Sequence, residues 1–107
     1  MKPKAGEVWL ADLGLAAKTR PVVALSFDDP DAPRALCIYI PLTSQNRGSR
    51  YEIPLGHLPW LAKESVANVQ GIGSLPLSRF EKKIGVLSET DFLKIKRSLI
   101  YACDLRV

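Results

Sequence analysis

The sequence predicts one mostly-β domain, a small barrel of short strands followed by a C-terminal α-helix. Its 107 residues, 47% hydrophobic and 24% charged, have the length and composition of a single folded domain covering residues 1–107. Up to residue 75, short apolar segments alternate with turn residues, as they do in proteins built from short strands. After Ser88, apolar residues recur at helical spacing instead. Five or six short strands closed by one helix favour a small barrel.

Three strands are predicted in the first half of the chain. They cover residues 6–13, 20–27 and 35–42, joined by a small-residue connection at 14–19 and an acidic surface turn at 28–33. The second strand begins with Arg20 and Pro21, and a proline is tolerated there because the first position of a strand needs no ladder N–H. The third strand is apolar throughout, which is typical of a strand that lies in the core.

Further strands are predicted in the middle of the chain. They cover residues 51–55 and 65–70, with a continuation at 71–75 after a bulge. A polar loop at 43–50 precedes the first of them, and a turn-rich crossing at 56–64 carries His57 and Trp60. The polar loop therefore directly follows the buried third strand.

The C-terminal part changes to a helical period. Residues 77–83 are predicted to form one or two helical turns before Gly85. Ser88 then has a carboxylate three residues later, which is the pattern of a helix N-cap. The residues expected to face the sheet are Phe92, Ile95, Leu99 and Ala102. On the other side of this helix, Lys94 and Arg97 are expected to point outward.

The sequence contains no recognisable metal or cofactor motif. His57 is the only histidine, and the Gly71-Ile-Gly run does not open a helix as a phosphate-binding loop would. Cys37 and Cys103 are interpreted as small core residues that stay reduced. Because no secretory signal or membrane-spanning apolar segment is found, we expect a cytoplasmic protein without a cofactor.

The charge balance suits a polyanionic partner. The chain has a net charge of +4, and its pI is near 9.3. Several of its cations are interpreted as belonging to solvated helix faces: Lys82, Lys83, Lys94, Lys96 and Arg97.

A second set of polar residues is expected where strands begin or end. Asn68 and Gln70 would face the same side of the fifth strand because they are two residues apart. The remaining candidates for binding are Lys18, Thr19, Arg20, Thr43, Ser44, Gln45, Asn46, Arg47 and Arg50. An arginine presents a fixed fork of donors to a phosphate, and hydroxyls and amides beside it can bond phosphate or base edges. Single-stranded RNA exposes both kinds of group.

The order of several segments resembles the MazF/PemK family of toxins over essentially the whole chain. The segments are GEVWLADL at 6–13, TRPVVALS at 19–26, IPLTS at 40–44, KESV at 63–66 and LSRFEKKIGVL at 77–87. The most specific are the Arg-Pro-Val-Val strand and the Arg-x-x-x-Lys-Ile-Gly run before the terminal helix.

This resemblance implies an SH3-like small barrel of the MazF, PemK and CcdB type. It implies a homodimeric type II toxin that cleaves single-stranded RNA without a metal ion and is held in check by an antitoxin protein. In the reaction, the 2′-hydroxyl would attack the adjacent phosphate, leaving a 2′,3′-cyclic phosphate and a 5′-hydroxyl. By position, Arg20 matches the family's phosphate-stabilising arginine and Thr43 its threonine at the end of the third strand.

The chain departs from the family pattern after the fifth strand. Gln70 stands where many members have an acid, Gly73 replaces an arginine, and Asn68 replaces another arginine found in some members. The connection at 14–19 also lacks a glutamate or histidine, and since Gln and Asn do not titrate, no general base is assigned. Two alternatives to the nuclease therefore stay open. One is a weak or inactive member that binds RNA or antitoxin. The other is a topoisomerase poison, which is disfavoured because the chain ends Asp104-Leu-Arg-Val without a tryptophan.

Overall fold

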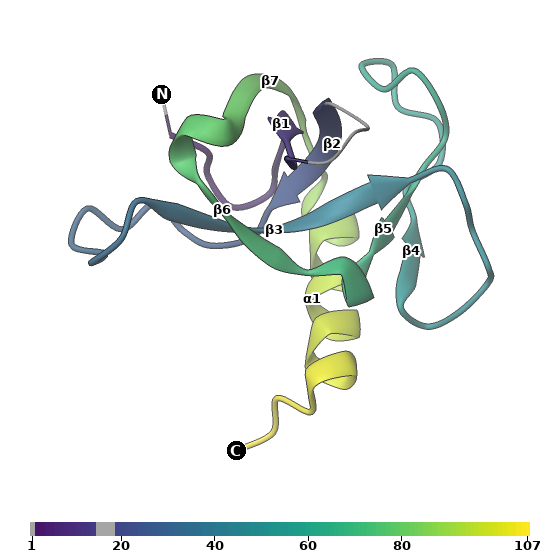
Figure 1. Cartoon of the computed structure of the whole chain (residues 1–107). Helices are drawn as coiled ribbons and strands as arrows, with labels where there is room; N and C mark the ends of the chain where they lie inside the picture. Colours follow the sequence, from purple (N-terminus) through teal and green to yellow (C-terminus); the bar gives the residue numbers. More distant parts are fainter. Residues whose placement is uncertain (1, 15–18) are drawn as a thin grey trace.

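The protein is described from a computed structural model, which covers residues 2–14 and 19–107. The predicted fold class is confirmed, because these residues form a mostly-β structure with one C-terminal helix (Figure 1). The strands are β1 (Glu7–Asp12), β2 (Thr19–Ala24), β3 (Leu36–Thr43), β4 (Glu52–Pro54), β5 (Val66–Asn68), β6 (Gly73–Pro76) and β7 (Phe80–Val86). The helix is α1 (Glu89–Cys103), and two 3-10 turns, η1 (Val69–Gly71) and η2 (Leu77–Arg79), precede β6 and β7.

The strands form an antiparallel sheet in the order β4-β5-β3-β2-β1-β7. The central strand β3 has β2 on one edge and shares its other edge between two strands. Its C-terminal residues Leu42 and Thr43 pair with β5, and its N-terminal residues pair with β6. The turn η1 carries the chain from β5 to β6, and α1 lies beneath this side of the sheet (Figure 1). The end of β3 thereby lies beside the start of β5, where Thr43 pairs with Val66. It also lies near the start of β2, because β2 and β3 are antiparallel.

Two hydrophobic cores lie on opposite sides of the strands because successive residues of a strand face opposite ways. On the helix side, Val8, Val23 and Ile40 are fully buried and pack with Ile95 of α1. The other core consists of Trp9, Ala11, Val22, Ala24, Cys37 and Phe80. There Trp9 and Phe80 meet edge to face with their ring centroids 6.4 Å apart.

The C-terminal helix follows the prediction. Ser88 caps it, its Oγ accepting a hydrogen bond from the Asp91 N–H at 3.1 Å. The predicted inner face packs against the helix-side core through Phe92, Ile95, Leu99 and Ala102. Lys94 and Arg97 are exposed, as expected. The buried Ser98 was not foreseen; its hydroxyl donates to the carbonyl of Arg50 at 2.7 Å and ties the helix to the loop before β4.

Two segment predictions need correction. One helical turn does form within residues 77–83, the 3-10 turn η2, but the strand β7 begins at Phe80, which is buried against Trp9. Residues 80–86 do not alternate cleanly because β7 pairs with β1 through two register shifts, and this irregular pairing hid the strand. Lys82 and Lys83 therefore lie on a strand. The expected bulge after residue 70 is also absent, since β5 ends at Asn68 and η1 follows it.

The cysteine prediction was correct for one residue of the two. Cys37 lies in the core with 2% of its surface exposed, and burial raises the pKa of its thiol. Cys103 is exposed at the end of α1, which extends beyond the sheet (Figure 1). In the part of the chain that the structure describes, no helix is long and apolar enough to cross a membrane.

Candidate functional site

Two adjoining hollows lie where the ends of β2, β3 and β5 meet. The larger, here called the groove, has a volume of about 730 Å³. It is lined by Leu10, Leu13, Arg20, Pro21, Pro41, Leu42, Thr43, Ser44, Gln45, Trp60, Leu61, Ala62, Lys63, Ser65 and Ile84. The second hollow, of about 550 Å³, is lined by Thr43, Gln45, Arg47, Ser49, Tyr51, Glu52, Asn68 and Gln70. Thr43 and Gln45 belong to both, so the two hollows form one continuous surface.

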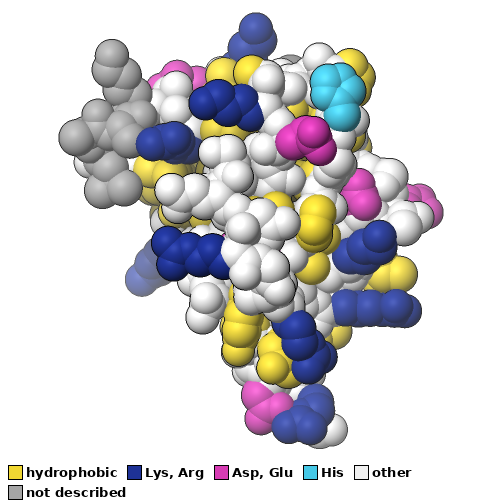
Figure 2. Space-filling model, turned by 90° about the vertical axis from the view of Figure 1, so that its right-hand side faces the viewer, with side chains coloured by type: hydrophobic (Ala, Val, Ile, Leu, Met, Phe, Trp, Pro, Cys, Tyr) yellow, Lys and Arg dark blue, Asp and Glu magenta, His cyan; other side chains and the backbone are white. Residues whose placement is uncertain are grey.

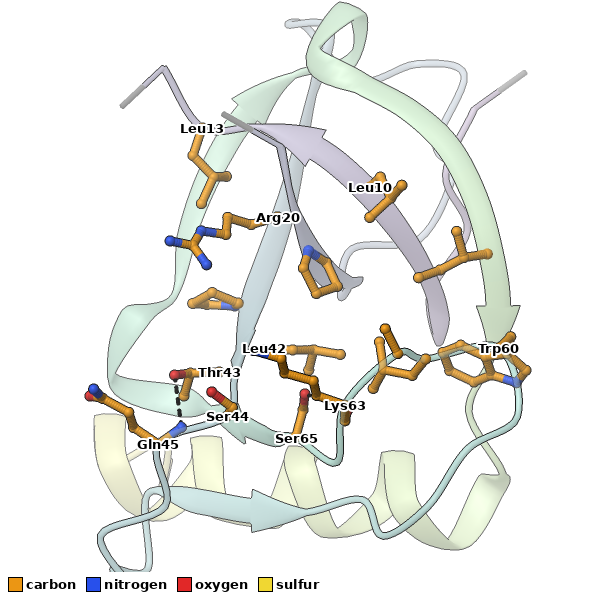
Figure 3. Close-up of a pocket in the computed structure, with 15 residues that line it drawn as sticks. Leu10, Leu13, Arg20, Leu42, Thr43, Ser44, Gln45, Trp60, Lys63 and Ser65 are labelled. Atoms are coloured by element: carbon orange, nitrogen blue, oxygen red, sulfur yellow. Dashed lines mark hydrogen bonds between the residues drawn. The ribbon is translucent and has the colours of Figure 1, made fainter. Parts of the chain in front are cut away.

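The groove has a polar end and an apolar end. The polar end is lined by Arg20, Thr43, Ser44 and Gln45. The guanidinium of Arg20 and the side chain of Thr43 lie on this same side of the groove (Figure 3). The apolar end is formed by residues of β1, β7 and the segment 60–62, with Trp60 at its far side (Figure 3). Such a division suits a ligand that is both anionic and partly apolar, as a nucleotide chain is.

Arg20 is positioned by its strand. It is the second residue of β2 and pairs with Ala11 of β1, and Pro21 beside it pairs with Leu10. The side chain is exposed and forms no ion pair with any residue of the described chain. Its N–H donors are therefore available to an anion in the groove.

Thr43 ends β3, where it pairs with Val66 of β5. Its Oγ1 accepts a hydrogen bond from the backbone N–H of Gln45 at 3.2 Å, which turns the chain away from the strand. Because the oxygen is the acceptor in this bond, the hydroxyl proton stays free to donate to a ligand. Thr43 thus has both a fixed position and an unused donor.

The polar loop after β3 is held in shape by Glu52. This carboxylate accepts hydrogen bonds from the backbone N–H of Arg47 at 3.1 Å, and from the N–H and hydroxyl of Ser49 at 3.1 and 2.8 Å. The Arg47 N–H, followed by the two Ser49 groups, lowers the pKa of Glu52. The Oδ1 of Asn46 accepts a further bond from the Gly48 N–H at 2.8 Å. The loop is therefore ordered, with Arg47 on the second hollow.

Asn68 and Gln70 line the same hollow, but they do not lie on one strand as predicted. Asn68 ends β5 opposite Glu52, and Gln70 lies in η1. Both line the second hollow. Glu52 is the only carboxylate among the described residues that line either hollow, and it was not a predicted site residue.

Some predicted residues lie elsewhere. The guanidinium carbon of Arg50 is 3.7 Å from the centroid of the Tyr101 ring, a cation–π contact with α1. Thr19, Asn46 and Arg50 line neither hollow, and Lys18 lies outside the described residues. Figure 2 shows the basic side chains scattered over one face of the molecule, with acidic and hydrophobic side chains between them.

Lys63 and Trp60 are groove residues that sequence reasoning did not select. Lys63 lies just before β5, in the KESV segment, and Trp60 lies earlier in the same loop. The Trp60 ring lies against Gly85 of β7 so closely that a Cβ atom there would overlap it. A glycine within a strand often marks such a close approach, so Gly85 was the one feature of the sequence that could have indicated the position of Trp60.

Comparisons with known proteins identify the chain's relatives. Residues 4–102 match the family described as PemK-like, MazF-like toxin of type II toxin-antitoxin system. No curated protein sequence matches the chain.

Several solved structures share the fold. One is a MazE–MazF crystal structure from Deinococcus radiodurans, with a TM-score of 0.85 and 19% identity over 99% of both chains. Another is a mycobacterial endoribonuclease in complex with its cognate antitoxin, with a TM-score of 0.83 and 22% identity over 98% of both chains. The Mycobacterium tuberculosis toxin MazF-mt6 has a TM-score of 0.81 and 23% identity, over 94% of this chain and 99% of that one.

Proposed function

The chain belongs to the PemK-like, MazF-like toxin family of type II toxin-antitoxin systems, and we propose that it is a metal-independent endoribonuclease of single-stranded RNA. The observation that carries the proposal is the joint placement of Arg20 and Thr43 at one end of the groove. One residue supplies a permanent positive charge and the other a positioned hydroxyl, and both suit a phosphate at that end.

The reaction is a transfer of the phosphoryl group within the RNA chain. The 2′-oxygen forms a bond to phosphorus while the bond from phosphorus to the 5′-oxygen breaks. The 2′-hydroxyl loses its proton and the departing oxygen gains one, so the products carry a 2′,3′-cyclic phosphate and a 5′-hydroxyl. Negative charge grows on the phosphorane oxygens in between. A guanidinium fixed beside them stabilises this charge more than it stabilises the starting phosphate, and this difference accelerates the reaction.

The second hollow continues the binding surface away from the reacting phosphate. Gln45, Arg47, Asn68 and Gln70 line it with amide groups and one cation. Amides can bond the base edges of an unpaired strand, and Arg47 can bond a phosphate. Ser44 lines the groove only. Thr19, Asn46 and Lys18 remain candidates for contacts outside the two hollows, whereas the guanidinium of Arg50 is engaged with the Tyr101 ring.

We also propose an antitoxin partner and a homodimeric state. One structure of the same fold is an endoribonuclease in complex with its cognate antitoxin, and another is a MazE–MazF crystal structure. An antitoxin that covered the groove would block RNA by occupying the surface that carries Arg20 and Thr43. Because single-stranded RNA is found in the cytoplasm, the protein is expected to act in that compartment.

A binding-only member of the family is the second candidate, and it is favoured by the residues after β5. Gln70 does not titrate, and Gly73 offers no charge where many members have an arginine. A Cβ atom at Gly73 would lie 3.1 Å from the Tyr39 hydroxyl oxygen, so Tyr39 of β3 would have to shift slightly to admit a side chain. The remaining candidate, a topoisomerase poison, has no such support.

RNA cleavage in the presence of EDTA separates these candidates. The purified protein should cut a mixed-sequence single-stranded RNA equally well with and without the chelator. Arg20→Ala should cut poorly, and Arg97→Ala, which changes an exposed arginine of α1, serves as the matched control for charge and for contaminating nucleases. Salt-sensitive RNA binding without cleavage would favour the binding-only candidate, and inhibition of supercoiling without RNA binding would favour the topoisomerase poison.

A further inference from the structure

The groove contains a second cation whose role the chemistry above does not use. Among the described residues that line the groove, Arg20 and Lys63 are the only charged side chains, and none is acidic. They come from different elements, Arg20 from β2 and Lys63 from the loop before β5. The Lys63 side chain extends along the groove towards its polar end (Figure 3). Two cations in a lining that holds no acid match a chain that carries more than one phosphate.

The backbone of Lys63 is held in place. The hydroxyl of Ser65, a buried residue, donates a hydrogen bond to the Lys63 carbonyl at 3.1 Å. Earlier in the loop, Trp60 is packed against Gly85, and the Leu61 N–H donates to the Leu58 carbonyl at 3.0 Å. These contacts fix where the lysine side chain begins.

The ammonium group itself is not engaged. Lys63 is exposed and forms no ion pair with any residue in the described ranges. Other lysines of this chain do have partners: Lys83 lies 3.0 Å from the Glu7 carboxylate, and Lys96 lies over the Phe92 ring. A cation that is anchored at its base and free at its tip can bind a ligand phosphate without first breaking an ion pair.

We propose that Lys63 binds a second phosphate of the RNA, adjacent to the one held by Arg20. The RNA backbone would then lie along the groove between β2 and the segment 60–63. Lys63 is a substrate-binding residue in this arrangement and does not act on the reacting phosphate. This inference rests on the proposed function, since it specifies how the same groove holds its RNA.

The proposal predicts a change in the salt dependence of RNA binding. Each phosphate contact with a single strand releases condensed counterions, which contributes about 0.7 to the slope of log Kd against log salt. Lys63→Ala should therefore reduce this slope by about 0.7, whereas Lys63→Arg should keep it. Lys94→Ala, on the exposed face of α1, should leave the slope unchanged. The probe is a fluorescent single-stranded RNA with 2′-O-methyl groups, which binds but cannot be cleaved through its 2′-oxygen.

Single-turnover cleavage of the unmodified RNA gives a second, independent readout. Lys63→Ala should raise the RNA concentration needed for half-maximal rate severalfold while the rate at saturation stays within about twofold, because Lys63 contributes to binding and not to the phosphorane. Circular dichroism confirms that each variant is folded. An unchanged salt slope in Lys63→Ala, or a saturating rate that falls as far as in Arg20→Ala, would overturn the inference.

The two proposals fail in different ways. If the unaltered protein binds RNA with the expected change of slope at Lys63 but never cleaves it, the nuclease proposal is wrong and the Lys63 contact stands. If cleavage is normal and the slope is insensitive to Lys63, only the Lys63 contact is wrong. A protein that neither binds nor cleaves RNA overturns both.

Discussion

The charge of Arg20 can be removed without disturbing the fold, since the side chain is exposed and the strand positions it through backbone pairing with β1. Arg20→Ala should lower the single-turnover rate of RNA cleavage by about a hundredfold or more, the scale of losing one preorganised donor. Arg20→Lys should restore part of the rate, because lysine supplies the charge without the bidentate fork. Rates should be measured at saturating RNA, with circular dichroism to confirm the fold.

A comparison with Thr43 makes this test sharper. Thr43→Val removes the hydroxyl that could donate to the phosphate, and it should reduce the rate less than Arg20→Ala does. Thr43→Ser keeps the hydroxyl and the bond from the Gln45 N–H, and should retain most of the activity. Full activity in a folded Arg20→Ala protein would show that the arginine does not stabilise the reaction.

Arg47 and Arg50 lie on the same loop but differ in their surroundings. Arg47 lines the second hollow, whereas the guanidinium of Arg50 lies over the Tyr101 ring. We therefore expect Arg47→Ala to lower the slope of log Kd against log salt by about 0.7 for single-stranded RNA, and Arg50→Ala to leave it unchanged. Titrations at several salt concentrations measure both slopes. A larger change for Arg50 than for Arg47 would contradict this assignment of the loop.

At this scale, the sequence predicted part of the candidate site. Arg20, Thr43 and Gln45 could be selected because polar residues at the ends of neighbouring strands converge in a small barrel. Lys63 and Glu52 could not, since each looks like an ordinary surface charge in the sequence. Their positions in the hollows depend on how the loops fold back, through the Trp60 contact in one case and the hydrogen bonds to Arg47 and Ser49 in the other.

The loop between β4 and β5 packs closely against β7 where Trp60 meets Gly85. Gly85 leaves room for the Trp60 ring, and any side chain at that position would displace it. Gly85→Ala should destabilise the protein by about 1–3 kcal/mol, the usual cost of overpacking a well-filled site, and should weaken RNA binding through movement of Lys63. Urea unfolding followed by circular dichroism measures the stability.

A double-mutant cycle provides the control for this contact. If Gly85→Ala acts by displacing the ring, combining it with Trp60→Ala should cost clearly less than the sum of the two single changes. Additive effects would show that the two residues act independently.

The elements of the fold were predictable where one period dominated. The C-terminal helix has both a cap at Ser88 and a regular inner face, so its start and its packing follow from the sequence. β7 shows no regular pattern, because Phe80 is buried while the three residues after it are exposed. Its pairing with β1 also shifts register twice. Tertiary pairing decided the structure of this segment, and local pattern did not reveal it.

The whole molecule exposes apolar residues that a second copy could cover. Leu36 and Ile38 of β3 are each 43% exposed, and Ile100 and Tyr101 of α1 are each 46% exposed. Because closed dimers commonly bury such residues, we expect a homodimer at micromolar concentration. Light scattering should give twice the monomer mass of 11.8 kDa. A monomer mass across the whole concentration range would contradict the expectation.

The central claim is that the protein cleaves RNA through attack by the neighbouring 2′-hydroxyl at the groove of Arg20. Its most direct test is cleavage in EDTA of a single-stranded RNA and of the same RNA carrying one 2′-deoxy residue at the cleaved position, with the product ends identified by mass spectrometry. We predict a 2′,3′-cyclic phosphate and a 5′-hydroxyl from the first, and no cleavage at the modified position of the second. Cleavage beside the 2′-deoxy residue, or products that end in a 3′-hydroxyl and a 5′-phosphate, would contradict the account.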